Sequence, residues 1–512
     1  MKILDCTIRD GGYYTNWDFD QDLINEYCKS MEKLPIEYIE VGYRSIPKQG
    51  YLGKYFYCPT YVLEELKNLM PSKKLVIILN EKDIRPEHIE KLLIPIKPYV
   101  TLIRLAVDPQ NFKRSLVLAK AIKALGFEIA LNVMYMSNWK NNSSFLDLLE
   151  GSDDTLDFFY MVDSYGGILP NEVKEIIKLV KSKTNVPLGF HGHDNLEMGL
   201  INTLAALEEG CEIIDATITG MGRGAGNLKT ELLLTYLESQ KLIELNFNML
   251  GRVVSGFENL KKIYGWGTSL PYMFSGAHSL PQKEVMDWVG MNRYSLSSIV
   301  NALNNKKLII EDNIKLPVLE KKNSFKTTII LGGGNTVKEN KDAIIKYAEK
   351  EKDFCLIHTG VKNILNFKNI GCKQFYSLVG VEGDMLLEQL ECKDYLNSVF
   401  LLPPYPRKMG VSLPEKIQSL SKELETIEFT KLATDSPFVV AVQAALDLGV
   451  KKILLIGFDG YNIDLNENQF ILAQENQNVI NDIIKNKDIS VTTLSPTKYE
   501  NIKLTSIYSL IQ

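Results

Sequence analysis

Eight short apolar runs separated by longer amphipathic stretches predict an α/β fold for the first part of this chain, a closed (β/α)8, or TIM, barrel over residues 1–240. A second α/β pattern predicts another domain over residues 323–512. Between them, residues 241–322 show helical spacing broken by Gly and Pro, which indicates a helical extension of the barrel. With 512 residues the chain is too long for one compact core, so several domains are expected.

The predicted barrel strands are rich in Val, Ile and Leu over their whole length, which is typical of strands buried on both faces. The stretches between them carry helical spacing, as in NEVKEIIKLVKSK. An open, doubly wound sheet is the alternative that the same alternation allows. The eight predicted strands lie at residues 2–8, 37–44, 74–80, 101–107, 127–135, 158–164, 186–193 and 212–219.

The composition is that of a globular protein, with 45% hydrophobic and 24% charged residues. Acidic residues outnumber basic ones, 63 to 58, and the net charge of −5 disfavours nucleic acid and membranes as partners. The seven cysteines form no C-x-x-C pair, the N-terminus has no apolar signal core, and no apolar run approaches the roughly 20 residues of a membrane span. We expect a cytoplasmic homo-oligomer, a dimer, that has free thiols and acts on small molecules.

Polar side chains follow most of the predicted strands at the point where each apolar run ends. In a barrel of parallel strands these ends meet at one rim, where catalytic residues gather. One polar residue there is expected for solubility, but six sets at one rim predict a functional site. The sets are Arg9-Asp10, Glu40 to Arg44, Asn132, Asp163-Ser164, His191 to His193 and Thr217 to Thr219.

His191 and His193, two of only five histidines, form the most specific of these sets. Residues i and i+2 of a strand face the same side, so both imidazoles can share one divalent ion. Asp10 can complete the ligands, because only one strand separates the first strand from the seventh in a closed barrel. These donors suit Mn²⁺, Mg²⁺, Fe²⁺, Co²⁺ or Zn²⁺ without selecting one. A hydrogen-bonded histidine pair and a local Arg9-Asp10 ion pair remain the alternatives.

Three motifs of the predicted barrel resemble a known enzyme family. LDCTIRDGG, HGHDN and GMGRGAGN, the last followed by Glu231, are similar to signatures of the metal-dependent TIM-barrel lyases and aldolases. This group includes 4-hydroxy-2-oxovalerate aldolase, 3-hydroxy-3-methylglutaryl-CoA lyase and 2-isopropylmalate synthase. The resemblance spans about residues 1 to 280, and VDSYGG (162–167) and YGWGTSLPYMFSG (264–276) draw it toward the 4-hydroxy-2-oxovalerate aldolase branch.

The resemblance implies that Asp10, His191 and His193 ligate a divalent metal, Mn²⁺ or Mg²⁺ most often. It implies that Arg9 stabilises an enolate oxygen. For Arg9 and Asp10 to serve one site, the first strand must end near them, and we expect Gly11 and Gly12 to permit an irregular exit. The expected substrate-binding residues are Glu40, Arg44, Asn132, Ser164 and Asn227, the last at the edge of the site.

One position departs from the aldolase branch, which carries a histidine base where this chain has Tyr13. We predict Tyr13 as a proton shuttle, with a metal-bound water or a purely packing aromatic lid as alternatives. Tyr272 is a second candidate for an acid or lid role, and helix packing is its simpler explanation. The departure bears on the substrate more than on the type of reaction.

The second predicted domain opens with TTIILGGGNTV, a strand, a glycine turn and a helix that can present backbone N–H groups to phosphate. Residues 433–461 resemble a stretch of bacterial sialyltransferase-like and motility-associated glycosyltransferase-like proteins. Together with GGGN near the start of the domain, this resemblance implies a Rossmann-like fold for residues 323–512. Those transferases use a late histidine as base, but no histidine follows His358 here, so a ligand-binding domain, an active transferase and a structural module all remain open. The residues implied in nucleotide or nucleotide-sugar binding are Gly333, Gly334, Asn335, Thr434, Ser436, Asp459 and Tyr461.

These patterns together predict a divalent-metal-dependent aldolase that makes or breaks a carbon–carbon bond next to a 2-oxo acid. Pyruvate and an aldehyde are the expected substrates, and the second domain makes a sugar or nucleotide-linked sugar in surface-glycan biosynthesis a hypothesis for the aldehyde. A Claisen-type synthase that joins an acyl-CoA to a 2-oxo acid is the alternative enzyme, and an aldolase fused to an active glycosyltransferase is another. A non-catalytic scaffold with a nucleotide sensor is the third reading.

Overall fold

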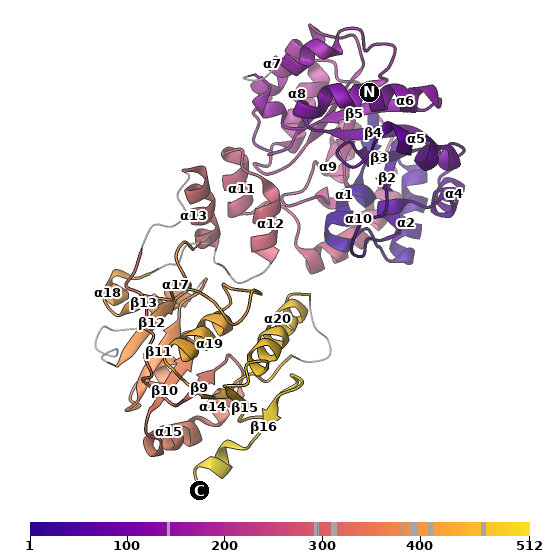
Figure 1. Ribbon diagram of the computed structural model, residues 1–512. Coiled ribbons are helices and arrows are strands. Elements are labelled where there is room, and N and C mark those ends of the chain that lie inside the picture. Colours follow the sequence, from indigo (N-terminus) through magenta and orange to yellow (C-terminus); the bar gives the residue numbers. More distant parts are fainter. Residues whose placement is uncertain are drawn as a thin grey trace. The chain divides into compact units, whose positions relative to one another are not determined.

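The computed structural model describes residues 1–140, 144–290, 294, 296–308, 315–380, 382–389, 397–407, 413–461 and 467–512. The chain forms two compact units, Met1–Met286 and Asp287–Gln512 (Figure 1). The predicted helical extension over 241–322 is divided between them. Its first two helices belong to the first unit, and a later one, α13 (Leu296–Lys307), belongs to the second.

The first unit is a closed barrel of eight parallel strands in sequence order, which confirms the predicted barrel and excludes the open sheet for this part of the chain. Each predicted apolar run contains or overlaps one strand. The strands are β1 (Lys2–Asp5), β2 (Tyr38–Tyr43), β3 (Lys74–Asn80), β4 (Val100–Val107), β5 (Glu128–Val133), β6 (Phe158–Asp163), β7 (Leu188–Gly192) and β8 (Ile213–Ala216).

Helices between the strands bury one apolar face against the barrel, and local signals fix where they begin. Asp20 caps α2 by accepting hydrogen bonds from the backbone N–H groups of Asp22 and Leu23, and Pro170 opens α7, where a missing N–H costs nothing. The helices are α1 (Thr7–Thr15), α2 (Gln21–Lys33), α3 (Lys54–Tyr57), α4 (Thr60–Leu69), α5 (Pro86–Leu93), α6 (Phe112–Ala124), α7 (Pro170–Lys181), α8 (Gly199–Glu208), α9 (Thr230–Ser239), α10 (Phe247–Tyr264), α11 (Leu270–Ala277) and α12 (Gln282–Gly290).

The barrel interior is layered from apolar to polar. A buried cluster that includes Tyr38, Leu102 and Ile213 fills one layer. Two residues further along the same strands, and so on the same side, stand charged or polar side chains. These inward pairs are Tyr38 and Glu40, Leu102 and Arg104, Ala130 and Asn132, Gly189 and His191, and Ile213 and Asp215. The polar layer therefore lies toward the carboxyl ends of the strands, where a barrel enzyme has its active site.

The chain leaves β1 differently from the sequence expectation. The strand ends at Asp5, and helix α1 carries Arg9 and Asp10 instead of a strand end. Gly11 and Gly12 keep helical backbone, so the expected irregular exit is wrong. A Cβ at Gly11 would lie 2.5 Å from Met221 Sδ, and one at Gly12 would lie 2.1 Å from the Trp17 ring. Close packing, and not backbone strain, requires glycine there.

The second unit contains one eight-stranded sheet in which all paired strands are parallel, in the order β13-β12-β11-β10-β9-β14-β15-β16. The chain runs outward from β9 to β13 and returns to pair β14 with β9, so the strand order reverses there. Ligands of such sheets bind at that reversal. The strands are β9 (Thr327–Leu331), β10 (Phe354–His358), β11 (Lys373–Ser377), β12 (Ser398–Leu402), β13 (Ser421–Glu423), β14 (Lys452–Ile456), β15 (Ser490–Thr493) and β16 (Lys503–Leu504).

Helix α19 is buried over most of its length and packs against strands β9 to β12, and α15 packs on the sheet face that presents Ile329 and Leu331. The remaining helices are α14 (Thr336–Glu339), α15 (Lys341–Lys350), α16 (Ile364–Phe367), α17 (Glu382–Gln389), α18 (Glu415–Gln418), α19 (Pro437–Asp447) and α20 (Glu467–Ile484).

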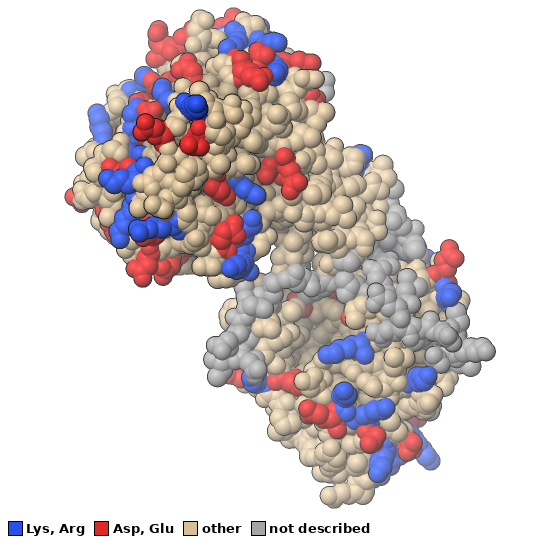
Figure 2. Space-filling model, turned by 180° about the vertical axis from the view of Figure 1, so that it is seen from behind, with Lys and Arg blue, Asp and Glu red and all other residues tan. Residues whose placement is uncertain are grey.

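Within the described residues, none of the helices combines the length and the apolar character that a membrane crossing requires. On the face drawn in Figure 2, Lys and Arg side chains of the first unit are interspersed with Asp and Glu. This face therefore presents no broad field of one sign, as the net charge of −5 leads one to expect.

Candidate metal centre

Asp10, His191 and His193 converge at the polar end of the barrel. One ligand atom of each lies within 4.8 Å of those of the other two, and Asp10 Oδ2 is 3.8 Å from His191 Nε2. Asp10 comes from α1, and the histidines come from the end of β7 and the residue after it. Barrel closure brings them together, because β8 pairs with both β1 and β7. All three side chains are nearly inaccessible to solvent.

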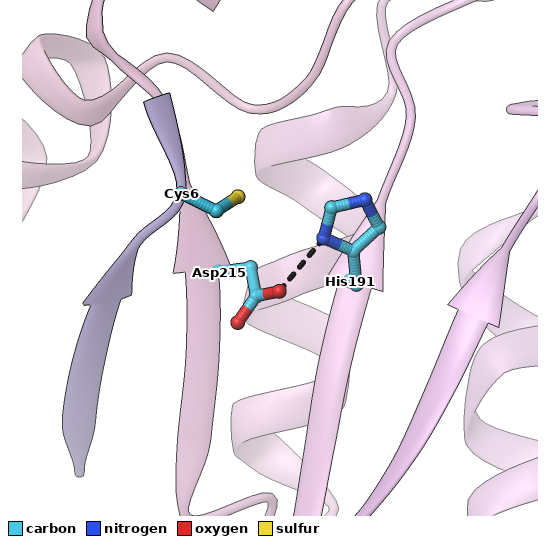
Figure 3. Close-up of side chains that lie close together, drawn as sticks. All are labelled: Cys6, His191 and Asp215. Atoms are coloured by element: carbon cyan, nitrogen blue, oxygen red, sulfur yellow. Dashed lines mark hydrogen bonds and ion pairs between the residues drawn. The ribbon is translucent and has the colours of Figure 1, made fainter. Parts of the chain in front are cut away.

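The two imidazoles are oriented by partners on their Nδ1 atoms. His191 Nδ1 lies 2.8 Å from Asp215 Oδ2 (Figure 3), and His193 Nδ1 lies 2.7 Å from the carbonyl oxygen of Asp163. A hydrogen bond from Nδ1–H to an oxygen leaves Nε2 without a proton and able to bind a metal. The arrangement is the one that metal-binding histidines adopt.

A second trio, Cys6, His191 and Asp215, also brings three ligand types close together (Figure 3). It is a poorer site. The Cys6 thiol donates to the Ala216 carbonyl, and burial raises its pKa well above the ordinary value, so the thiolate that a metal needs is disfavoured. Asp215 is already bound by Arg104 Nη2 at 2.6 Å. These residues therefore lie on the Nδ1 side of His191 and orient its ring.

Asn227 supplies a fourth polar group beside the three ligands. Its Nδ2 donates to Asp10 Oδ2 at 2.6 Å, and its Oδ1 is buried without a hydrogen-bond partner among the described residues. An unpaired buried carbonyl is costly, and a cation would satisfy it. Two imidazole nitrogens, a carboxylate and an amide oxygen fit a divalent ion.

The charges around the centre favour the ligating protonation states. Burial opposes ionisation of Asp10, but the neighbouring Arg9 guanidinium and the two imidazoles outweigh it and lower the pKa to about 2. Burial and the adjacent His191 lower the pKa of His193 to about 3. Near neutral pH, Asp10 is therefore a carboxylate and His193 a neutral imidazole.

Two buried arginines tie the polar layer together. Arg9 donates through Nε to Glu40 Oε2 at 2.6 Å and also pairs with Asp10. Arg104 donates to Asp215 and, through Nε, to Asn132 Oδ1 at 2.7 Å, and its Nη1 lies 3.4 Å from Glu40 Oε2. The structure thus joins the predicted residues Arg9, Glu40 and Asn132 to the metal centre through one network.

Other predicted site residues lie around this network or away from it. Tyr13 Oη is 3.0 Å from Tyr43 Oη, and the Tyr13 ring lies under the Arg223 guanidinium, 4.9 Å from centroid to Cζ. Ser164 follows β6 and accepts a hydrogen bond from the Tyr135 N–H at 2.9 Å.

Tyr272 and Arg44 occupy supporting positions. The Tyr272 ring packs on the glycine loop, since a Cβ at Gly224 would lie 2.8 Å from it. Arg44 donates to three backbone carbonyls, those of Leu92, Tyr57 and Cys58, at 2.7 to 3.3 Å. These contacts hold loops in place.

Sequence reasoning missed Arg104, Asp215, Tyr43 and Arg223. A signal existed for the first two, because a single charge inside an otherwise apolar strand, as in TLIRLAV and EIIDATIT, indicates a polar interior. Their mutual pairing was not readable, since 111 positions separate them. Arg223 lies inside the motif GMGRGAGN, in which the only predicted site residue is Asn227.

The second unit has a cavity of about 570 Å³ at the reversal of strand order. Gly333, Gly334 and Asn335 line it after β9, and Asp459 and Tyr461 line it after β14. Ser436, at the start of α19, joins them, whereas Thr434 lines a separate cavity beside Tyr405 and Arg407. Six of the seven residues predicted to bind a nucleotide thus share one cavity.

Known proteins are similar to this chain over about half its length. The HMGL-like family model matches residues 109–255. The chain is 30% identical over 251 residues to 4-hydroxy-2-oxovalerate aldolase of Carboxydothermus hydrogenoformans, a match that covers 46% of this chain and 70% of that protein. It is 24% identical over 237 residues to oxaloacetate decarboxylase of Mycobacterium tuberculosis, covering 46% of this chain and 69% of that protein.

A solved structure is similar as well. It is the crystal structure of the N-terminal domain of a proposed aldolase from Bacteroides vulgatus, 55% identical, with a TM-score of 0.56, covering 59% of this chain and all of that domain. A protein that is 30% identical to this chain over more than two thirds of its own length belongs to the same family. This chain therefore belongs to the HMGL-like family and is an enzyme of the aldolase and lyase class.

Proposed function

We propose that the first unit makes or breaks a carbon–carbon bond next to the carbonyl group of a 2-oxo acid, with pyruvate as the oxo acid and an aldehyde as its partner. One observation carries the proposal: Asp10 Oδ2 and His191 Nε2 lie 3.8 Å apart beside His193, with both Nδ1 atoms engaged elsewhere. The names of two relatives support it, because 4-hydroxy-2-oxovalerate and oxaloacetate are both 2-oxo acids.

Asp10, His191 and His193, with Asn227 Oδ1 beside them, would hold a divalent cation, Mn²⁺ or Mg²⁺ in the first place and Co²⁺ or Zn²⁺ as alternatives. When bound, such an ion supplies a Lewis acid for the oxygen of the 2-oxo group. The buried carboxylates of Glu40 and Asp10 hold the Arg9 guanidinium, so this cation can stabilise negative oxygen without first reorganising.

The remaining roles fall to hydroxyl groups. In the addition direction the methyl carbon of the 2-oxo acid loses a proton and its electron pair attacks the aldehyde carbon, whose oxygen then needs a proton. Tyr13 carries this proton from carbon to oxygen and returns to its starting state. The Ser164 hydroxyl, which accepts a hydrogen bond from the Tyr135 N–H, donates its own hydrogen bond to an oxygen of the substrate.

Deuterium exchange tests the proposal without knowledge of the aldehyde. Pyruvate in D₂O with the Mn²⁺-loaded protein is expected to exchange its methyl protons, followed by NMR. Asp10→Asn is expected to lose both the metal and at least 100-fold of the exchange rate. Asp22→Asn, which removes an exposed carboxylate, is the matched control. Full metal retention in Asp10→Asn would refute the assigned ligands.

The Claisen-type synthase is the second candidate, because it uses the same enolate chemistry. Consumption of an acyl-CoA together with a 2-oxo acid, without aldehyde-dependent product, would favour it. The similarity to an aldolase and a decarboxylase favours the aldol reaction.

For the second unit we propose binding of a nucleotide or nucleotide sugar in the 570 Å³ cavity. The carboxylates of Glu382, Asp459 and Glu475 and the rings of Tyr461 and Tyr499 line it, and such groups suit the hydroxyls and base of a nucleoside. The pairing of the two units motivates the further proposal that the aldehyde is a sugar used in surface-glycan biosynthesis. A thermal-shift comparison of CMP, UDP and GDP tests the binding, because a ligand of the native state raises stability.

A further inference from the structure

Arg223 projects from the glycine loop toward the metal centre. Its neighbours make this loop narrow: a Cβ at Gly222 would lie 2.5 Å from Asn227 Nδ2, and Gly224 has a positive φ of 65°. The loop therefore brings Asn227 to Asp10 and Arg223 to the Tyr13 ring at the same time.

The guanidinium is held by an aromatic face and not by an acid. Its Cζ lies 4.9 Å from the Tyr13 ring centroid, and the Tyr13 hydroxyl is fixed by Tyr43. Stacking covers one face of the guanidinium and leaves the N–H groups around its edge. The Tyr13 ring belongs to the same helix, α1, as Arg9 and Asp10, so the Arg223 guanidinium over that ring lies near the candidate metal ligand Asp10.

Arg223 differs in this from the two other arginines of the site. Arg9 is paired with Glu40 and Asp10, and Arg104 with Asp215 and Glu40. Across the part of the chain that the structure describes, no carboxylate lies within 4.0 Å of Arg223. A partly buried guanidinium with no carboxylate in contact, near the candidate metal ligands, can bind an anion.

We propose that Arg223 binds an anionic group, a carboxylate or a phosphate, on the carbonyl acceptor, so that this enzyme prefers charged over neutral aldehydes. The inference rests on the proposed aldol reaction and specifies its second substrate. Arg223 is thus a specificity-determining residue for the acceptor. The oxo acid itself is bound at the metal centre and Arg9.

Anion binding is measured first, on the full chain treated with EDTA so that no metal attracts the anion. Succinate and inorganic phosphate are titrated separately by calorimetry, with tryptophan fluorescence as a second readout because Trp17 contacts the Tyr13 ring at 5.0 Å. We expect at least one anion to bind, at least tenfold more weakly in Arg223→Gln and with intermediate strength in Arg223→Lys. Arg252→Gln, at an exposed position of α10, is expected to match the unaltered protein.

Specificity is measured next with acceptors of matched shape. Succinic semialdehyde is compared with butanal, and glyceraldehyde 3-phosphate with glyceraldehyde, so the two pairs separate carboxylate from phosphate. The ratio of kcat/KM for the charged over the neutral member is expected to exceed ten and to fall at least tenfold in Arg223→Gln. An unchanged ratio, or anion binding that is absent or equally strong in Arg223→Gln, would overturn the inference.

The two proposals fail in different ways. If pyruvate exchange is absent although anion binding depends on Arg223, the aldol reaction is wrong and the anion site stands. If exchange occurs while neither binding nor the ratio depends on Arg223, the aldol reaction stands and the anion site is wrong.

Discussion

At the scale of single residues, the centre depends on side chains that never touch the metal position. Asp215 accepts from both His191 and Arg104, so one carboxylate orients a ligand and neutralises a buried guanidinium. Burial opposes its charge, but Arg104 and His191 together lower its pKa. Asp215 therefore links a candidate metal ligand to the buried Arg104.

We predict that Asp215→Asn lowers metal affinity by about 10- to 100-fold, because His191 loses the carboxylate that orients it. The free energy of unfolding should fall by about 3 kcal/mol, since Arg104 is left with less compensation for its buried charge. Calorimetric Mn²⁺ titration and urea unfolding measure the two effects. An affinity equal to that of Asp22→Asn would contradict the assigned role.

Gly12 allows a second prediction at this scale. In Gly12→Ala the new Cβ would lie 2.1 Å from the Trp17 ring, so the ring must move, and we expect a loss of about 1–3 kcal/mol in the free energy of unfolding. Gly251→Ala is the matched control, because it is also helical and no atom lies within 4 Å of the new methyl group. That variant should gain about 0.5–1 kcal/mol. Equal effects in both variants would show that Trp17 does not constrain position 12.

At the scale of elements, the loop after β8 positions two functional side chains through its backbone. Gly220, Gly224 and Gly226 have positive φ angles of 69°, 65° and 80°. A Cβ at Gly226 would also lie 2.2 Å from the carbonyl oxygen of Gly220. The glycines are thus needed for the path of the loop, which explains why the motif is glycine-rich.

We predict that Gly226→Ala displaces Asn227 and lowers metal affinity by at least tenfold. Gly210→Ala is the control for backbone strain alone, since Gly210 has a φ of 85° and meets only the flexible end of Lys181. Both variants should lose stability, but only Gly226→Ala should lose metal. Metal titration of the two purified variants measures this difference. Equal metal affinities would show that the path of the loop does not control metal binding.

At the scale of the whole molecule, we expect the free energy of unfolding to depend on pH, in part through a buried histidine of the second unit. Burial lowers the pKa of His358 to about 3, against 6.5 for the exposed group, and the ring stacks on Tyr376 at 4.2 Å. Between these pH values the unfolded chain binds a proton that the folded chain does not. The free energy of unfolding therefore falls as the pH falls from about 6.5, by up to about 1.4 kcal/mol per pH unit.

We predict that His358→Gln removes this contribution, because glutamine can still donate to Gln374 but does not titrate. Urea unfolding by circular dichroism between pH 7 and pH 5 should show a smaller loss of stability in the variant than in the unaltered protein. His278→Gln, at an exposed histidine, should leave the loss unchanged. The same slope in all three proteins would refute the assignment.

Much of the first unit was predictable from the sequence, because strand periodicity and helix spacing are local properties. The eight barrel strands and the paired imidazoles of His191 and His193 follow from patterns within single runs of the chain. The helix at Arg9 and Asp10 did not, since its glycines are selected by contacts with Met221 and Trp17.

The sequence by itself determined the order of strands and helices and the kinds of ligand that stand at their ends. Only the tertiary structure decided which of these groups meet, that Asp215 lies behind His191, and that Arg223 faces the centre without an acidic partner among the described residues. The physical reason is that closing a barrel sets the distances between residues that are more than two hundred positions apart, as for Asp10 and Asn227. Hydrogen bonds and charge pairs at those distances cannot be read from any local pattern.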